Sequence, residues 1–551
     1  MRQPAKSIAR KVIYLFLYIS LQSTHPAHGQ TTAHSQTPAI INLKCEYLTN
    51  PLGIDNPNPR ITWQLRDAEQ DIHQTVYQIL VGTDSAAVAN GHGNTWASGT
   101  INNANNLITY NGIALQPFTK YYWTVVAETN KDHHLQSSVA SFETGMMSQY
   151  NWKGAWISDG ESIHVKPAPY FRKVFPVTKK ILSARAYISA AGLYELYLNG
   201  KRIGDHQLDP MFTRFDRRNL YVTYDVTQIL QEGRNAVGVL LGNGWYNFQT
   251  MAVWDYERAP WRSRPAFCLD LRITYDDGSV ETVTSDQSWK TALSPLVYNS
   301  IYTGEQYDAR KELPGWNTVN FDDGKWHRAK YRESPSNNIV AQTLWPIRHV
   351  EKLQPVSVTR TSDTSWLYDF GRNIAGISEL TIAGDSNTRV RVSHAERLDK
   401  KGKIDQSNVD YFLSAETRSD DPFATDSYRL SGKGRQTFTP RFSYKGFRYA
   451  EVTSSRPLSL GREDLVAWSM HSDVPAVGKI TTSSDLINKI YAATNASYLA
   501  NLFGYPTDCP QREKNGWTGD AHIASETGLY NFDAITIYEK WLADLRDEQQ
   551  P

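Results

Sequence analysis

The sequence has few cysteines, no long apolar run beyond its first residues and almost no net charge. Its three cysteines, Cys45, Cys268 and Cys509, lie far apart, a set that predicts neither a disulfide framework nor a metal cluster. Lysine and arginine total 58 against 57 acidic residues, which leaves a formal net charge of +1. That balance gives no electrostatic reason to expect nucleic acid or an anionic membrane as a partner. We therefore expect no bound metal, no nucleic acid and no membrane insertion.

The composition is that of a globular protein with several domains. Apolar residues make up 40% and charged residues 21% of the 551 residues, which are proportions of a folded chain, and the length exceeds that of one ordinary domain. Aromatic residues reach 12%, with 16 Trp and 31 Tyr. Such rings form the cores of β-sandwiches or flat surfaces for sugars, and core packing is the commoner use.

The first residues have the pattern of a secretory signal peptide, residues 1–29. The apolar run at residues 12–21 follows a basic region, and Ala27-His28-Gly29 is a small-x-small cleavage site. The apolar run is much shorter than the roughly 20 residues that span a bilayer. We expect a mature chain that begins near Gln30, in the periplasm or outside the cell. The basic region consists of Arg2, Lys6, Arg10 and Lys11.

Residues 37–147 predict a small β-sandwich. Short runs rich in β-branched and aromatic residues, at 61–65, 76–82 and 121–127, are separated by clusters of Gly, Pro and Asn. The arrangement resembles a fibronectin III-like module. Nothing in this region indicates chemistry, so spacing or docking is the expected role.

Residues 150–340 predict a larger β-sandwich. Alternating residues at 193–198 lead into Asn199-Gly200, and a second run at 269–273 leads into an Asp-Gly turn at 277–278; both are strong hairpin signals. Three aromatic side chains in this region are candidates for a sugar-binding face or, more commonly for such rings, for an interface with a neighbouring domain: Trp245, Tyr246 and Trp254.

Residues 345–455 predict a third β domain, because residues 367–371, 389–392 and 447–452 alternate with period two. His394 and Glu396 lie two apart and share one strand face. They suggest either a site or a structural pair, and the structural pair is the commoner case. The charged stretch at residues 399–426 is typical of a solvated loop.

From about residue 475 the apolar period becomes helical. Ser483 or Ser484 is the expected N-cap of the first helix. A short helix is expected at about residues 520–530 with Asp520 as its cap, and a third helix after Asp533, also a cap. The apolar positions of the first helical face are Leu486, Ile487, Ile490, Tyr491, Thr494, Tyr498 and Leu502.

Between the first two helical patterns lies a loop, residues 505–520, that carries Asp508, Arg512, Glu513, Trp517 and Asp520. Two prolines and two glycines exclude regular structure. Glycoside hydrolysis needs one carboxylic acid to protonate the leaving oxygen and a second carboxylate for water or the anomeric carbon. Further acids and an arginine can hold sugar hydroxyls. The alternative is that the two aspartates cap helices and that Arg512 and Glu513 form a surface ion pair.

From Asp508 to Asp520 the loop reads Asp-Cys-Pro-Gln-Arg-Glu-Lys-Asn-Gly-Trp-Thr-Gly-Asp. It resembles, at every fixed position, the signature of bacterial α-L-rhamnosidases, an inverting glycoside hydrolase family with an (α/α)6 barrel. Residues 241–246 and 307–310 resemble the lectin-like jelly-roll domain of that family, and residues 345–455 the β-sandwich beside its catalytic domain. The implied fold is multidomain and mainly β: three β-sandwich-type domains followed by the first helices of an incomplete barrel, residues 475–551.

The resemblance also implies roles for the loop residues. Glu513 resembles the general acid, Asp508, Arg512 and Asp520 resemble residues that hold the rhamnose, and Trp517 resembles a pocket wall. It implies hydrolysis of terminal non-reducing α-L-rhamnose from glycans or plant glycosides, with no metal or organic cofactor. Cys509 has no specific histidine partner in the sequence, so we expect it to be a packing residue.

Three helical patterns cannot close a barrel of helical hairpins. We therefore expect an N-terminal part of such an enzyme, with the general base absent, apolar helix faces uncovered and little activity alone. Two alternatives remain open. One is another inverting (α/α)6 glycosidase that acts on a different sugar. The other is a non-catalytic carbohydrate-binding protein built from the β domains.

Overall fold

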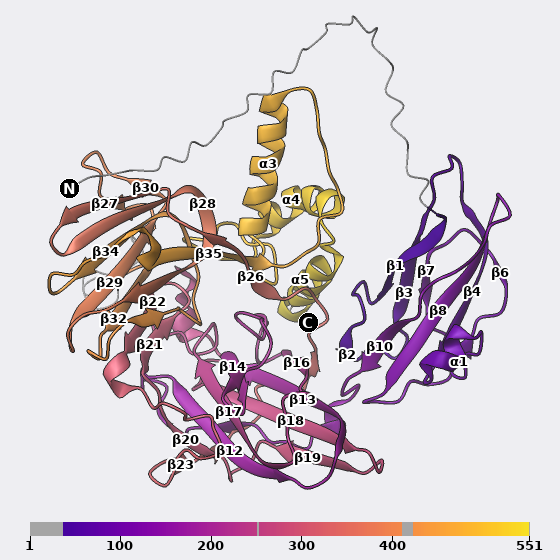
Figure 1. The fold of residues 1–551 in the computed structure, drawn as a ribbon, viewed down its shortest axis with the longest axis horizontal. Helices are drawn as coiled ribbons and strands as arrows, with labels where there is room; N and C mark the ends of the chain where they lie inside the picture. Colours follow the sequence, from indigo (N-terminus) through magenta and orange to yellow (C-terminus); the bar gives the residue numbers. More distant parts are fainter. Residues whose placement is uncertain (1–36, 251–252, 410–421, 550–551) are drawn as a thin grey trace, which may run out of the picture.

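A computed structural model describes residues 37–250, 253–409 and 422–549. The predicted signal peptide, residues 1–29, lies outside these ranges. The described chain has three β domains and a group of helices, which follow one another from indigo to yellow in Figure 1. The predicted multidomain, mainly β class is thereby confirmed. None of the helices in the described ranges combines the length and apolar character that crossing a bilayer requires.

The first domain is a sandwich of two sheets. The three predicted runs lie in strands β3, β4 and β8, and Trp63, Tyr77 and Trp123 are buried between the sheets. One sheet has the order β1 (Ala39–Cys45), β3 (Arg60–Arg66), β7 (Leu107–Thr109). The other has the order β2 (Leu52–Ile54), β10 (Ala140–Thr144), β8 (Lys120–Thr129), β4 (Gln74–Gly82), β5 (Trp96–Ala97), with β6 (Ile101–Asn102) beside β4, β9 (His134–Gln136) beside β8, and the helix α1 (Ser85–Ala89) after β4.

The second domain is a larger two-sheet sandwich, and both predicted hairpins are present. Asn199 and Gly200 both have positive φ, 50° and 85°, which the tight turn between β14 and β15 requires. One sheet has the order β24 (Lys330–Tyr331), β11 (Ile157–Ser158), β18 (Ala266–Tyr275), β13 (Ile181–Ala191), β16 (Asn219–Asp225), β25 (Ile339–Ala341), with β19 (Val280–Thr284) beside β18. The other has the order β15 (Lys201–Arg202), β14 (Leu193–Leu198), β17 (Gly233–Gly242), β12 (Pro169–Val177), β20 (Lys290–Leu293), β23 (His327–Arg328).

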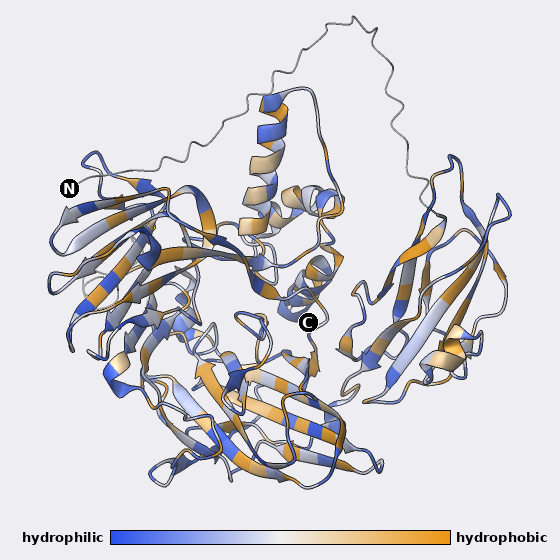
Figure 2. Ribbon diagram, viewed as in Figure 1, coloured by the Kyte–Doolittle hydropathy of each residue, from blue (hydrophilic) through white to orange (hydrophobic). Residues whose placement is uncertain are grey.

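The third domain is built on one curved ten-stranded sheet. Apolar side chains alternate with polar ones along its strands, as the orange and blue segments in Figure 2 show. Strands β21 and β22 belong to this sheet although residues 296–308 lie inside the range predicted for the second domain. The order is β21 (Leu296–Ser300), β22 (Gly304–Asp308), β32 (Thr425–Arg429), β29 (Arg389–Ala395), β34 (Lys445–Ser454), β28 (Ser365–Ile382), β35 (Leu465–Ser472), β26 (Ile347–Leu353), with β27 (Ser357–Ser362) and β33 (Gln436–Phe438) beside β28.

Short elements complete the β domains. The strands β30 (Arg397–Leu398) and β31 (Ile404–Asp405) form a small ribbon. In the described ranges, four 3-10 turns connect larger elements: η1 (Gln149–Asn151), η2 (Val253–Arg258), η3 (Ala309–Lys311) and η4 (Arg462–Asp464).

The long strand β28 changes partner at Gly376, which pairs with Lys445 of β34 and with Ser469 of β35. Its φ is +156°, and a Cβ there would lie 1.9 Å from the carbonyl oxygen of Trp468. Only glycine avoids that overlap with backbone. The curvature of the sheet therefore depends on this position.

Three helices follow the third domain: α3 (Asp485–Ala500), α4 (Thr518–Asn531) and α5 (Ile535–Glu548). Ser484 caps α3, as predicted. Two predicted caps are wrong. The residue before α4 is Trp517, so Asp520 lies inside the first turn, and the residue before α5 is Ala534. Asp533 instead forms an ion pair with Lys44 of the first domain.

The outer face of α3 is apolar and exposed at Leu486, Ile487 and Ile490, as expected for a helix without a partner on that side. By contrast α5 lies close to the β domains near the centre of Figure 1. Arg218 of the second domain donates to Asp544 at 2.7 Å and to Asp547 at 2.6 Å. These ion pairs fix α5 against the second domain.

We predict that Gly376→Ala lowers the free energy of unfolding by about 2–3 kcal/mol, because the methyl group overlaps the Trp468 carbonyl and the φ is strained. Gly461→Ala is the matched control in the same domain, since its φ is −111° and the nearest atom to an added Cβ is 3.7 Å away. Urea unfolding followed by tryptophan fluorescence measures both. Equal stability of the two variants would contradict the role of Gly376.

Candidate active site

The loop between α3 and α4 is held by two tyrosines of the third domain's sheet region and by one hydrogen bond within the loop. The ring of Phe503 stacks on Tyr444 of the third domain, with centroids 3.8 Å apart. The Tyr505 hydroxyl donates to the carbonyl oxygen of Lys514 at 3.0 Å. The Tyr302 hydroxyl, from the turn between β21 and β22, donates to the carbonyl oxygen of Glu513. The loop is therefore fixed on both sides of Glu513, although it has no regular secondary structure.

The Glu513 side chain is mostly buried, with 15% of its surface exposed. One carboxylate oxygen accepts from Arg512 Nη2 at 2.8 Å, and the other accepts from Trp517 Nε1 at 2.8 Å. The predicted neighbours Arg512 and Trp517 thus lie on Glu513. The Arg512–Glu513 ion pair of the alternative interpretation is present, but its carboxylate lies in a partly closed site and not on an open surface.

Asp508 and Asp520 line one pocket of about 610 Å³ between α3 and α4. Asp508 accepts from the backbone N–H of Asn515 at 3.0 Å, so its carboxylate is fixed within the loop. Asp520 is exposed in the first turn of α4, where the helix dipole favours a negative charge. Tyr498 of α3 and Asn501, which follows the helix, also line this pocket. The two aspartates therefore present oxygen acceptors to the same hollow.

Cys509 forms hydrogen bonds with both Asp508 and Glu513. Its thiol donates to Asp508 Oδ2 at 3.0 Å, and its sulfur accepts from the backbone N–H of Glu513 at 3.3 Å. Burial raises the pKa of the thiol, and the hydrogen bond to Asp508 adds to that rise. A protonated, hydrogen-bonded thiol is a poor nucleophile, which agrees with the expected packing role.

The sequence analysis missed Lys514, whose buried ammonium donates to the carbonyl oxygens of Tyr444 at 2.8 Å and Pro510 at 2.6 Å. It also lies 3.6 Å from the centre of the Tyr444 ring. Burial holds the pKa of Lys514 well below its usual range. A single lysine in a polar loop gives no sequence signal of burial, because such side chains are normally solvated.

The three aromatic candidates of the second domain have three different environments. Trp245 is buried at the contact with the loop, where it packs against Tyr302. Trp254 and Trp517 are exposed by 44% and 41% and lie edge to face, with centroids 5.0 Å apart. Together these two rings form an aromatic surface beside Glu513, one from the second domain and one from the loop.

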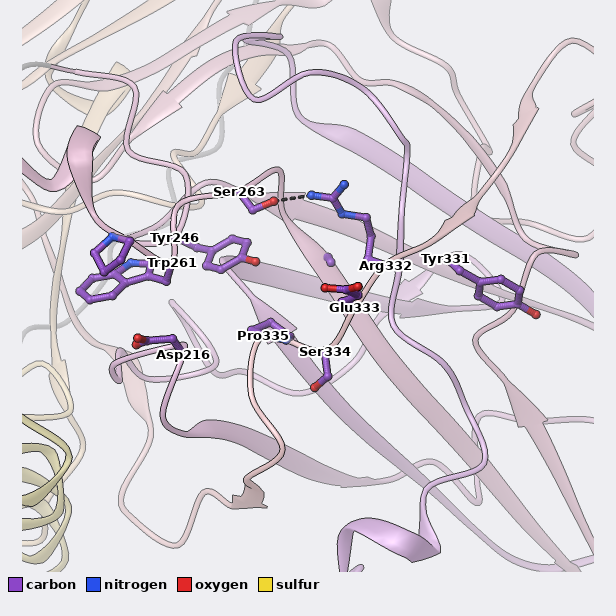
Figure 3. Close-up of a pocket in the computed structure, with 11 residues that line it drawn as sticks. Asp216, Tyr246, Trp261, Ser263, Tyr331, Arg332, Glu333, Ser334 and Pro335 are labelled. Atoms are coloured by element: carbon purple, nitrogen blue, oxygen red, sulfur yellow. Dashed lines mark hydrogen bonds between the residues drawn. The ribbon is translucent and has the colours of Figure 1, made fainter.

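Tyr246 lines a separate pocket of about 530 Å³ in the second domain (Figure 3). Figure 3 shows Trp261 beside Tyr246. To their right lie the Glu333 carboxylate and the Arg332 side chain, which donates to Ser263. No loop residue lines this pocket in the described part of the chain. The predicted sugar-binding face of Trp245, Tyr246 and Trp254 is therefore not one surface.

His394 and Glu396 do not share a strand face, because β29 ends at Ala395 and Glu396 lies in the bend that follows. His394 is buried, its Nδ1–H donates to the carbonyl oxygen of Ala424 at 2.9 Å, and Nε2 accepts from the Ser378 hydroxyl at 2.7 Å. Burial lowers the pKa of His394 to about 4, although Asp426 opposes that shift. Burial also raises the pKa of Glu396. The histidine is a hydrogen-bonded core residue.

Comparisons with known proteins match the chain domain by domain. Residues 40–148 match a Rha78A-like N-terminal immunoglobulin domain and residues 179–351 an alpha-L-rhamnosidase N-terminal domain. Residues 359–471 match a bacterial alpha-L-rhamnosidase concanavalin-like domain, and residues 475–551 a bacterial alpha-L-rhamnosidase 6 hairpin glycosidase domain. The β domains and the acid-bearing helical segment thus define a multidomain protein of the glycoside hydrolase class. Within that class, the chain belongs to the bacterial α-L-rhamnosidase family.

Individual relatives agree with this assignment. An α-L-rhamnosidase of Formosa agariphila is 32% identical over an alignment of 541 residues, which covers 93% of this chain and 56% of the relative. The structure of a Dictyoglomus thermophilum α-L-rhamnosidase superposes with a TM-score of 0.85 at 37% identity, over 93% of this chain and 58% of that one. A Streptomyces avermitilis α-L-rhamnosidase complexed with L-rhamnose gives 0.86 at 25% identity, over 93% and 65%. The chain thus spans little more than half the length of the first two relatives.

We predict that stability falls as the pH is lowered from 6.5 to 4, in part because of His394. Over that range the unfolded histidine, with a pKa near 6.5, binds a proton that the folded one does not bind, so the free energy of unfolding decreases with falling pH. Because the pKa of His394 is about 4 in the folded protein, this residue lowers the free energy of unfolding by about 3 kcal/mol between pH 6.5 and 4.

The variant His394→Gln removes this titration and should lose less stability across the window, whereas His92→Gln, at an exposed position, should follow the unmodified chain. Urea unfolding at pH 7, 6, 5 and 4.5 measures the slopes. Parallel slopes for His394→Gln and the unmodified chain would contradict the assignment.

Proposed function

We propose that this chain forms the acid-bearing part of an inverting α-L-rhamnosidase, which removes terminal non-reducing α-L-rhamnose from glycans or plant glycosides. The observation that carries the proposal is the environment of Glu513. Its carboxylate is mostly buried and is contacted by Arg512 and Trp517, and its backbone N–H donates to the Cys509 sulfur, whose thiol donates to Asp508. A carboxyl group fixed next to Asp508, which lines a sugar-sized pocket, is a candidate proton donor to a glycosidic oxygen.

In the proposed mechanism Glu513 donates its proton to the departing glycosidic oxygen. Asp508 and Asp520 accept hydrogen bonds from rhamnose hydroxyls, because both present carboxylate oxygens to the pocket between α3 and α4. Arg512 holds the sugar and orients the Glu513 carboxylate at 2.8 Å. The exposed rings of Trp517 and Trp254 supply an apolar wall for a C–H face of the sugar.

An inverting enzyme also needs a general base that activates water on the opposite side of the sugar, about 6.5–9.5 Å from the acid. We assign this base to the part of the relatives' length that the present chain does not span. The side chains named here then account for sugar binding and for protonation of the leaving group. Activation of water is assigned to the length of the relatives that this chain does not span.

We predict that Glu513→Gln lowers kcat about 10²–10⁴-fold for rhamnosides with poor leaving groups, in a protein that carries these residues and has the full length of the relatives. The loss should be much smaller for a nitrophenyl rhamnoside, whose leaving oxygen hardly needs a proton. The product formed first should be the β anomer, observed by NMR before mutarotation.

Glu526→Gln is the matched control, since Glu526 is exposed on the same helix that follows the loop. Binding of L-rhamnose to the 551-residue chain, measured by saturation-transfer NMR, should survive Glu513→Gln and be lost in Asp520→Asn. An equal loss of kcat for both leaving groups would exclude Glu513 as the acid. Activity on other aryl glycosides but not on rhamnosides would favour a different inverting glycosidase.

We infer from the pattern of residues 1–29 that the protein is exported to the periplasm or secreted, with cleavage near Gly29. We predict that protein recovered from outside the cytoplasm begins near Gln30, as N-terminal sequencing would measure. Replacing Leu15 and Leu17 with Gln interrupts the apolar run and should leave the uncleaved chain in the cytoplasm. Export of that variant at the normal level would contradict the inference.

A further inference from the structure

Positive charge is concentrated on one outer face of the third domain. The side chains of Lys311, Arg389, Arg391 and Arg429 line a hollow of about 440 Å³ over β22, β32 and β29, together with Arg310 and the single acid Asp308. We call this surface the basic groove. The whole chain has 58 basic and 57 acidic residues, so composition alone does not produce such an excess.

The strand register places like charges next to one another. Arg389 of β29 pairs directly with Arg429 of β32, and Asp308 of β22 pairs with Arg429 on its other side. Arg391 lies two residues along β29 and so points to the same face as Arg389. Val390 and Tyr428, which point the other way, are buried in the core. Like charges directly opposite each other destabilise a sheet, so the pairing of Arg389 with Arg429 is unfavourable by itself.

The one acid of the groove is already engaged. Both oxygens of Asp308 accept from Arg310, at 2.9 and 2.7 Å, and Asp308 also accepts from the Arg310 backbone N–H. Among the described residues, Lys311, Arg389, Arg391 and Arg429 take part in no ion pair within 4.0 Å. Exposed arginines elsewhere in the same domain do have acidic partners, for example Arg372 with Glu351.

Other acids of this domain have hydrogen-bond or ion-pair partners of their own. Glu451 of β34 lies opposite Ser393 and accepts from the Ser365 hydroxyl. Asp385 pairs with Arg456. The groove therefore retains a net positive charge that an anionic ligand would neutralise.

The chemistry of the lining selects the kind of anion. Guanidinium groups bind carboxylate and sulfate groups through paired N–H donors, and Gln306 and Ser427 add neutral polar groups suited to hydroxyls. The lining tyrosines, Tyr307 and Tyr428, turn their rings toward the core and are half-buried and buried. Among the described lining residues, no exposed ring is therefore available for stacking of nucleic acid bases. The spacing of Arg389 and Arg391 along the strand, about 7 Å, suits successive charges along an extended chain.

We propose that the basic groove binds acidic polysaccharide, a glycan chain that bears uronate carboxylates or sulfate esters. The groove would hold such a chain on the third domain, apart from the helices that carry the loop with Glu513 (Figure 1). That the bound glycan also contains rhamnose rests on the proposed function, whereas the anion binding does not.

Affinity electrophoresis of the 551-residue chain in gels containing polygalacturonate, dextran sulfate or uncharged dextran tests the proposal. We expect retardation by at least one of the two charged polymers and none by dextran, with retardation weakening as NaCl is raised. Binding to polygalacturonate alone would identify uronates as the ligand groups, and binding to dextran sulfate alone would identify sulfate esters. Absence of retardation by both would overturn the proposal.

The variant Arg389→Gln/Arg391→Gln should bind at least about tenfold more weakly, as expected for the loss of two exposed ionic contacts. Arg360→Gln/Arg372→Gln removes the same charge from exposed positions of the same domain and should bind like the unmodified chain. Equal weakening in both variants would show a general charge effect and overturn the proposal, as would equal binding of polyglutamate. Near-UV circular dichroism confirms that each variant is folded.

Failure of this proposal can be distinguished from failure of the proposed function. Glu513→Gln should leave retardation by the charged polymer unchanged, because Glu513 lies outside the groove. Arg389→Gln/Arg391→Gln should leave cleavage of a small nitrophenyl rhamnoside unchanged in a protein of full length. Loss of polymer binding in Glu513→Gln would place the anion site at the loop and not in the groove.

Discussion

The contact between the loop of residues 505–520 and the start of β34 determines where Glu513 lies. A Cβ at Gly446 would stand 2.9 Å from the Gln511 Cβ and 3.0 Å from the Pro510 Cγ, so only glycine at this position lets the loop lie so close to the strand. The buried Lys514 ammonium then joins the two segments through the carbonyl oxygens of Tyr444 and Pro510. Because Glu513 precedes Lys514 directly, its backbone is held by a β domain as much as by the helices that the loop connects.

This contact depends on polar groups that are costly to bury. An ammonium group away from water needs substitutes for its hydration, and here two carbonyl oxygens and the Tyr444 ring provide them. Beside it, Lys445 and Asp426 form an ion pair in which 1% and 0% of the side chains are exposed. Loss of either partner would leave an uncompensated buried charge, so the pair restricts the first residues of β34 to one arrangement. The polar groups at the start of the strand therefore contribute geometry more than stability.

Local patterns were sufficient to predict the β strands and the two hairpins, because alternation and the Asn199-Gly200 turn act within a few residues. The loop residues were also predictable as a group, since a short signature lists them together. Features set by distant contacts were not predictable. Asp533 pairs with Lys44, 489 positions away, so it does not cap the helix beside it. Strands β21 and β22 join the third domain through pairing with β32, which no local pattern within residues 296–308 reveals. The burial of Lys514 likewise depends on Tyr444, a residue of another domain.

One sheet carries both the support of the loop and the basic groove. Strand β34 contacts the loop at Gly446 and pairs through residues 449–454 with β29, which presents Arg389 and Arg391 on the outer face. Hydrogen-bonded neighbours in a sheet form a rigid support, so the two positions keep a fixed separation. A polymer held in the groove would raise the local concentration of its own chain ends near the helices without any additional contact there. The local concentration rises most for chain ends whose distance along the polymer from the bound part matches the separation of groove and helices. A shorter segment cannot reach the helices, and a much longer one lowers the local concentration of its end. A rigid sheet between two binding positions would thus select for glycan length as well as for charge.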